Sequence, residues 1–307
     1  MISTKRLCNT LQLALSICLL LFSVAHADQG DVSWEGWEFS YDTDGTEGLE
    51  LTDVSFQGLK ILAKASFPVM RVEYDNDVCG PFADILWANT YVPIELDPPY
   101  DSCNNDSGLC ARTYTQDGSD YLELGINSEL GEYDIYQSFI FSPNGIMDSQ
   151  VFSRGLQCEE DHRHHAHWMF DFDIDGSEDD QVLKNSGDLQ TSEFNDRKIS
   201  TDFWTIRDAV SGLRVELDPG SSDGFTDNFA QWDVAVRKWN RGETTGWRLG
   251  ARGEIGDTYH DSENINRQNI VFWYVAHLDH KSLEGATKWH SSGPRIQVIK
   301  PGPVLLP

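Results

Sequence analysis

Histidines and aspartates gather in the segment 161–176, which holds four of the nine histidines of the chain. On a β-strand, successive side chains point to opposite faces, so His162 and His164 would share a face with Trp168 and Phe170. These apolar neighbours predict that the two imidazoles face a core. Paired imidazoles in such a setting indicate a transition-metal site.

The same segment ends in Asp171-Phe-Asp173-Ile-Asp175-Gly176, whose carboxylates would lie on the opposite face of the strand. Carboxylate oxygens are ligands for a second, hard cation. The spacing also matches the start of an EF-hand loop, but Val182 stands at the twelfth position, where a bidentate Glu is required. The flanks indicate strand rather than helix, and we therefore reject an EF-hand.

The N-terminus predicts an exported protein. Lys5 and Arg6 precede an apolar stretch over residues 11–25, and Ala25-His26-Ala27 has the small-residue pattern of a cleavage site. We expect residues 1–27 to be a secretory signal peptide and the mature protein to be secreted or periplasmic. No later segment approaches the roughly 20 apolar residues of a membrane-spanning helix, so no membrane span is expected.

The chain is strongly acidic, with a formal net charge of −27. Such a surface repels nucleic acid and anionic membranes and attracts cations. We therefore expect no nucleic-acid partner. A solubilising surface is the simpler explanation of the charge, and steering of cationic substrates is the alternative.

Four cysteines remain after the predicted leader: Cys79, Cys103, Cys110 and Cys158. In an oxidising compartment they predict two disulfides. The short, turn-rich interval from Cys103 to Cys110 favours one bridge there and a long-range bridge between Cys79 and Cys158, although three pairings are possible. A thiolate metal site is less favoured because the cysteines are not clustered.

Strand patterns dominate residues 28–307, with no linker or repeat, and indicate one all-β domain, a large antiparallel β-sandwich. The expected strands are 34–41, 49–56, 59–67, 70–74, 121–126, 133–141, 162–174, 203–207, 212–217, 233–238 and 270–277.

Several of these segments, in the same order, resemble the catalytic domain of copper-containing amine oxidases, in a shortened form that lacks the smaller N-terminal domains. The matching segments are Trp34–Tyr41, Glu47–Phe56, Ile61–Ser66, Met70–Tyr74, the metal strand from His162 to Gly176, and Asn269–Tyr274 followed by His280.

The resemblance implies copper(II) bound by His162, His164 and His280. Three neutral imidazoles with open positions suit Cu(II), and two histidines at i and i+2 can chelate if a third comes from a facing strand. The resemblance selects His280 over His277 and His290.

A peripheral calcium site is also implied by the resemblance. Its ligands would be Asp171, the carbonyl of Phe172, Asp173, Asn269 and the carbonyl of Ile270. The family usually has an acid where Asn269 stands. The alternative is a solvated acidic face.

Members of the family oxidise primary amines with topaquinone, which copper and dioxygen make from a tyrosine. Residues 131–145 resemble the segment that carries this tyrosine and place Tyr133 at the precursor position. Glu132 replaces the usual asparagine and Ile135 the second tyrosine of the motif. Tyr133 as an ordinary sheet aromatic is the alternative, and Tyr136 is the other candidate tyrosine.

The reaction also needs a general base to remove the α-proton of the bound amine. Family position implies Asp84 as this base and Phe82 as an aromatic gate over the quinone. The usual glycine-rich sequence after the aspartate is replaced by Ile85-Leu86-Trp87, and Asp77 is the substitute candidate.

The sequence thus predicts oxidative deamination of a small primary amine by dioxygen, giving aldehyde, ammonia and hydrogen peroxide. A homodimer is a further expectation. The alternative is a non-catalytic, secreted copper-binding sandwich that has lost the quinone. A cupin-like oxygenase is less favoured because no carboxylate follows shortly after His164.

Overall fold

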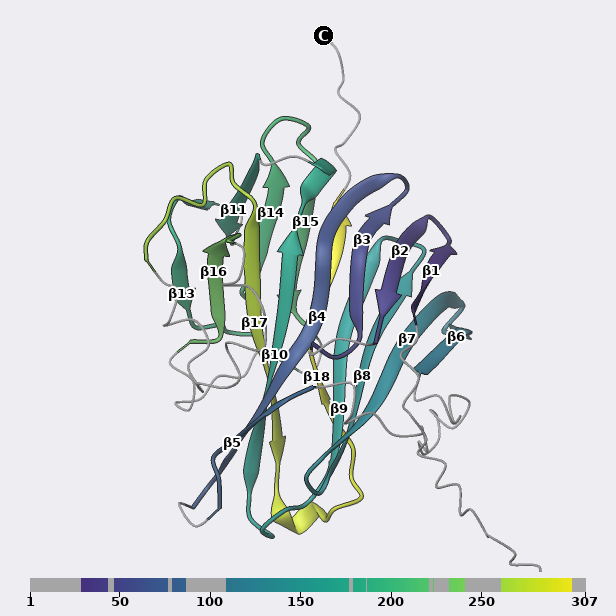
Figure 1. Cartoon of the computed structure of the whole chain (residues 1–307), viewed down its shortest axis with the longest axis vertical. Coiled ribbons are helices and arrows are strands. Elements are labelled where there is room, and N and C mark those ends of the chain that lie inside the picture. Colours follow the sequence, from purple (N-terminus) through teal and green to yellow (C-terminus); the bar gives the residue numbers. More distant parts are fainter. Residues whose placement is uncertain are drawn as a thin grey trace, which may run out of the picture.

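The computed structural model describes residues 29–43, 47–76, 79–86, 109–176, 179–185, 187–220, 223, 232–240 and 261–299. These residues form two large antiparallel sheets that face each other (Figure 1). The predicted all-β antiparallel sandwich is thereby confirmed. The predicted leader, 1–27, lies outside the described residues.

The nine-stranded sheet carries the histidine-rich strand near its middle. Its order is β1 (Gln29–Trp34), β2 (Trp37–Asp42), β3 (Glu50–Phe56), β4 (Leu59–Tyr74), β10 (His162–Phe172), β17 (Ile270–His280), β16 (Val234–Lys238) and β13 (Phe194–Asp196), and β5 (Phe82–Ile85) also pairs with β4.

The ten-stranded sheet covers the inner face of the first. Its order is β12 (Asp188–Gln190), β11 (Asp180–Lys184), β14 (Trp204–Asp208), β15 (Arg214–Pro219), β19 (Pro294–Ile299), β9 (Ile146–Gly155), β8 (Tyr133–Ser142), β7 (Ser119–Leu130) and β6 (Leu109–Gln116), and β18 (His290–Ser292) also pairs with β9.

Aromatic side chains fill the space between the sheets. Phe139 of β8 meets Trp168 of β10 edge-on at a centroid distance of 5.5 Å, and Trp204 of β14 meets Phe272 of β17 at 5.6 Å. The buried amide of Gln137 on β8 both donates to and accepts from the backbone of Leu49. Burial of these large side chains is the main force that joins the two sheets.

Two strand predictions were wrong in detail. The expected strand 34–41 is a hairpin, because Glu35 and Gly36 adopt positive φ angles and form a tight turn between β1 and β2. The expected strands 59–67 and 70–74 are one strand, β4. Pro68 lies between them, where the pairing with β10 shifts register, and a bulge tolerates a residue that lacks an N–H.

The predicted long-range disulfide between Cys79 and Cys158 is confirmed. Cys110 is also disulfide-bonded, while Cys103, its expected partner, lies outside the described residues. In the part of the chain that the structure describes, no helix is long and apolar enough to cross a membrane.

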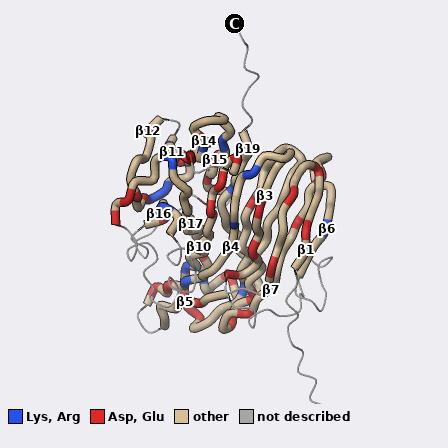
Figure 2. Tube along the Cα trace, turned by 45° about the horizontal axis from the view of Figure 1, so that its top comes forward, with Lys and Arg blue, Asp and Glu red and all other residues tan. Residues whose placement is uncertain are grey.

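Acidic residues are spread over the strands and the turns at the ends of the sandwich rather than gathered in one patch (Figure 2). This distribution accords with a generally solubilising acidic surface.

Candidate metal centre

His162, His164 and His280 lie together at one end of the inner face of the nine-stranded sheet, and we call them the inner triad. His162 is the register partner of His280 across β10 and β17, so both side chains point to the same face. The ring of His162 lies 5.0 Å from that of His164 and 4.7 Å from that of His280, centroid to centroid. All three are buried.

Two imidazoles of the triad each have one nitrogen committed to a neighbour. Nδ1 of His162 donates to the carbonyl of Glu160 at 2.9 Å, and its buried Nε2 has no hydrogen-bond partner among the described residues. Nδ1 of His164 lies 3.2 Å from the hydroxyl of Ser153. With Nδ1 as the donor, each ring keeps the lone pair of Nε2 for a metal.

His280 is oriented the other way round. Its Nε2 donates to the carbonyl of Gly285 at 3.1 Å, and its buried Nδ1 has no hydrogen-bond partner within the described parts of the chain. The triad therefore offers two Nε2 atoms and one Nδ1 atom, each with its tautomer set by the opposite nitrogen. Such a donor set fits Cu(II).

Burial keeps these rings in the form that a metal needs. Desolvation lowers the pKa of His162 and holds that of His164 well below its usual range, and the neighbouring histidines lower them further. Both imidazoles are thus neutral at pH 7 and available as ligands.

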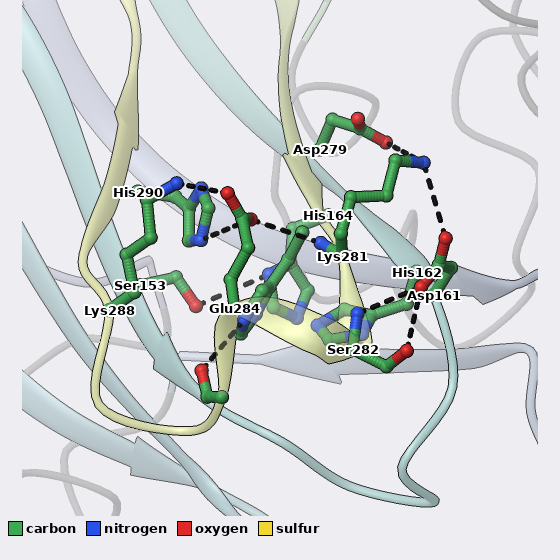
Figure 3. Close-up of polar contacts among 12 residues, drawn as sticks. Ser153, Asp161, His162, His164, Asp279, Lys281, Ser282, Glu284, Lys288 and His290 are labelled. Atoms are coloured by element: carbon green, nitrogen blue, oxygen red, sulfur yellow. Dashed lines mark hydrogen bonds and ion pairs between the residues drawn. The ribbon is translucent and has the colours of Figure 1, made fainter.

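A fourth histidine, His290 of β18, lies beside the inner triad, its ring 4.3 Å from that of His280. His280, Glu284 and His290 form one of the two described groups whose possible ligand atoms all lie within 4.8 Å of one another. Figure 3 shows the carboxylate of Glu284 beside the ring of His290, where the closest N–O distance is 3.4 Å. His290 thus stands where a ligand to the same metal could stand.

Asp161, just before β10, forms hydrogen bonds and a charge contact with the loop that follows β17. Its carboxylate accepts from the backbone N–H and the hydroxyl of Ser282, at 2.8 and 2.9 Å, and lies near the amine of Lys281 (Figure 3). These contacts hold Gly285, and with it the ring of His280, in place.

Tyr133 reaches the inner triad from the opposite sheet. Its ring meets His164 edge-on at 4.6 Å, and its hydroxyl lies 2.9 Å from the hydroxyl of Tyr74 and accepts from the backbone N–H of Gln157 at 3.2 Å. Burial raises the pKa of Tyr133, and the two hydrogen bonds offset part of that rise. Tyr74 is a member of the site that the sequence did not reveal.

A cavity of about 170 Å³ opens in front of Tyr133. Phe82 and Asp84 line it, as do Tyr133, Ile135 and His164. The structure therefore brings the predicted base and gate to the same cavity as the predicted quinone precursor. Asp84 lies at an exposed edge, and partial desolvation of its carboxyl raises its pKa. The other candidate base, Asp77, lies outside the described residues.

Tyr136 lies on the opposite face of β8 from Tyr133. Its hydroxyl donates to Glu123 at 3.0 Å, and its ring packs against Phe152. Because side chains alternate along β8, Tyr136 does not point toward the cavity that Tyr133 lines. Of the two departures from the family motif, Glu132 is exposed in a turn and Ile135 is buried at the cavity wall.

The predicted calcium ligands also come near one another, at the far end of β10. Burial of the Asp171 carboxyl, together with the nearby charge of Asp173, raises the pKa of Asp171 to about 7. The side-chain oxygen of Asn269 is buried and has no hydrogen-bond partner among the residues described. Lys60 lies 2.8 Å from Asp173 and balances part of the negative charge.

Asp180 is a further carboxylate in this region that sequence analysis missed. Burial, then repulsion by Asp173 and other acids, raises its pKa to about 8, although the N–H of Ile174 points at one oxygen. Its other oxygen is buried with no hydrogen-bond partner in the described segments. Crowded acids with an unsatisfied amide oxygen beside them fit an oxygen-ligated cation. Asp175, by contrast, is exposed in the short 3-10 helix η3 (Ile174–Gly176).

No protein-family model and no curated protein matches the chain. Among solved structures, the chain is similar to the lysyl oxidase of Pichia pastoris, with 14% identity and a TM-score of 0.71 over 88% of this chain and 51% of that one. It is also similar to a copper-containing benzylamine oxidase from Hansenula polymorpha, with 15% identity and a TM-score of 0.67 over 88% of this chain and 59% of that one. An amine oxidase from Aspergillus nidulans is similar as well, with 14% identity and a TM-score of 0.71 over 89% of this chain and 52% of that one.

The chain spans about half the length of these structures. The likeness establishes the fold, which is an amine-oxidase-like β-sandwich.

Proposed function

We propose that this chain is a primary-amine oxidase that uses copper and a topaquinone derived from Tyr133. Copper would be held by Nε2 of His162, Nε2 of His164 and Nδ1 of His280. The observation that carries the proposal is that Tyr133 of one sheet packs on His164 of the other, and that both residues line the same cavity as Asp84.

The overall reaction would be R-CH2-NH2 + O2 + H2O → R-CHO + NH3 + H2O2. When bound, the quinone and copper supply the electron-accepting chemistry. Asp84 would take the α-proton of the bound amine onto a carboxylate oxygen. Phe82, packed edge-on against Tyr74 and 41% exposed, would cover the reacting carbon and limit the entry of water.

Tyr74 and Gln157 would orient the oxygen of residue 133. The Tyr74 hydroxyl and the Gln157 N–H both lie at this oxygen, so they can stabilise negative charge that develops there. Around the cavity, Met70, Leu130 and Ile135 offer apolar contacts to the side chain of the amine. A cavity of this size favours a small substrate.

The proposal includes export by the predicted leader 1–27, a calcium ion at Asp171, Asp173 and Asn269 with the carbonyls of Phe172 and Ile270, and a homodimer. Acids at the far end of β10, and a nearby amide oxygen with no hydrogen-bond partner among the described residues, support the calcium ion. The disulfide between Cys79 and Cys158 accords with an oxidising compartment.

The decisive experiment is to load copper-free protein with copper in air and examine residues 132–136 by peptide mass spectrometry. We expect an oxidised Tyr133, a visible band that reacts with phenylhydrazine, and peroxide release from small primary amines. Unmodified Tyr133, with no peroxide from a panel of amines, would reject the oxidase.

A non-catalytic copper-binding sandwich is the second candidate function. It is favoured by the raised pKa of Tyr133, because processing by copper requires the phenolate. In that case copper would bind to the inner triad with full occupancy, and Tyr133 would remain a tyrosine.

A further inference from the structure

The opposite face of β10 and β17 repeats the histidine pattern of the inner triad. His165 and His167 alternate with His162 and His164 along β10, and His277 of β17 is the register partner of His165, as His280 is of His162. We call His165, His167 and His277 the outer triad. Each face of this strand pair thus carries a His-x-His from β10 and one histidine from the neighbouring strand, β17.

We infer that the outer triad is a second metal site, which binds a nitrogen-preferring transition-metal cation such as zinc. The inference does not depend on the proposed oxidase activity, because it uses none of the residues of the inner triad or the cavity.

Burial is the first support. The three side chains are 0 to 3% exposed, and the rings of His165 and His277 lie 4.9 Å apart. Both ring nitrogens of His167 are buried and have no hydrogen-bond partner among the described residues. An imidazole carries a donor and an acceptor, and leaving both unsatisfied in a core costs a few kcal/mol. A bound cation would satisfy the acceptor.

The protonation states also suit a metal. Burial, with the nearby charges of Arg71 and the other histidines, holds the pKa of His167 well below its usual range. Desolvation likewise lowers the pKa of His277. The two rings are therefore neutral at pH 7 and keep a lone pair for coordination.

Asp233 supplies the support that metal-binding histidines usually have. Its Oδ1 lies 3.1 Å from Nε2 of His277, and its Oδ2 accepts from the backbone N–H of Lys198 at 3.0 Å. A carboxylate at Nε2 favours the proton there and leaves the lone pair of Nδ1 for the metal.

One of the surrounding positive charges is balanced before a metal binds. Lys198 lies 3.3 Å from Asp223, with both side chains fully buried. Neither triad is among the described groups whose ligand atoms all lie within 4.8 Å of one another. Side-chain rotation must therefore draw the outer rings together as the cation binds.

The three buried imidazoles would fill three positions of a tetrahedral zinc ion and leave the fourth to a water molecule. A metal here would fasten β10 to β17 directly behind the inner triad, and would restrict the backbone that also presents His162 and His164.

The test is the zinc content of full-length protein produced with zinc, measured by elemental mass spectrometry after dialysis. We expect two equivalents for the wild type, one for His162→Ala/His164→Ala and one for His165→Gln/His167→Gln. The control is Met169→Leu, a volume-conserving change two residues further along the same face, which should retain two equivalents.

One zinc per chain in the wild type with none in His162→Ala/His164→Ala would overturn the inference, as would an unchanged content in His165→Gln/His167→Gln. Should the latter variant fail to fold, cobalt in His162→Ala/His164→Ala decides: we expect an intense tetrahedral absorption band that His277→Gln abolishes, and its absence contradicts the outer site. Failure of the oxidase proposal would instead appear as unmodified Tyr133, with these zinc counts unchanged.

Discussion

The two faces of β10 place the same residue type in two different chemical settings. His164 of the inner triad lines a cavity of about 170 Å³, and Tyr133, a titratable ring from the other sheet, packs against it. The outer triad is buried, His167 packs against Trp232, and the nearby Lys198 is paired with Asp223. Access to a cavity, rather than the histidines themselves, is what makes the inner face the candidate for chemistry.

The largest effect should come from removing the inner histidine of β17. His280→Ala should lose one copper equivalent per chain and all quinone formation, because it removes a buried Nδ1 that has no hydrogen-bond partner among the described residues. Copper analysis and phenylhydrazine absorbance measure both losses.

His290→Ala is the competing change, since its ring lies 4.3 Å from that of His280 and the proposal does not use it as a ligand. If His290→Ala lost the copper and His280→Ala kept it, the ligand assignment would be wrong and His290 would replace His280.

The next largest effect should come from Asp84→Asn, which removes the proposed base. Removing a general base typically slows the reaction by about 10²- to 10⁴-fold, and the amide would leave copper binding unchanged. Stopped-flow reduction of the quinone by amine measures this step. Asp75→Asn, on an exposed side chain outside the cavity, is the control.

The pH profile sharpens the same test. Because desolvation raises the pKa of Asp84, its carboxylate forms only above the usual range of an aspartate. The wild-type rate should therefore rise with pH through that displaced pKa, and Asp84→Asn should lose this limb. An identical acidic limb in Asp84→Asn would assign it to another group.

Calcium should have a smaller effect, on stability rather than on chemistry. A ligand at a hundred times its Kd stabilises the folded state by about 2.7 kcal/mol, so the melting temperature should rise on a calcium titration. Asp171→Asn with Asp173→Asn should remove this response while copper binding persists. Asp175→Asn, at an exposed position in the 3-10 helix that follows β10, is the control. An unchanged melting temperature in the wild type would indicate a merely solvated acidic face.

Local patterns predicted much of the fold and of the inner site. Alternation along 162–174 correctly placed His162 and His164 on the core side, because the apolar residues of β10 have a period of two. The same reasoning treated the odd positions as a single cation-binding face, yet His165 and His167 are buried there. A strand in the middle of a sheet can be covered on both faces, which alternation alone does not reveal.

Contacts between residues far apart in the sequence were not predicted, for a different reason. Tyr74 and Tyr133 are 59 residues apart and come together only because β4 and β8 lie in opposite sheets. The segment after β10 brings Asp180 close to Asp173, and no rule of sequence spacing predicts this contact. Pairing within a strand can be predicted from period, whereas pairing between sheets depends on how the layers align.

The smallest expected effect concerns the contact between these two tyrosines, which joins the inner-triad region to β4. Tyr74→Phe removes one hydroxyl of a buried hydrogen bond of 2.9 Å and leaves the oxygen of Tyr133 with the N–H of Gln157. A net contribution of about 1 kcal/mol to the free energy of unfolding is expected for such a bond. In copper-free protein, a double-mutant cycle of Tyr74→Phe and Tyr133→Phe should give a coupling energy of that size, measured by chemical denaturation. Strictly additive single changes would mean that the two hydroxyls do not interact, and the proposed orientation of the oxygen of residue 133 would then depend on Gln157 alone.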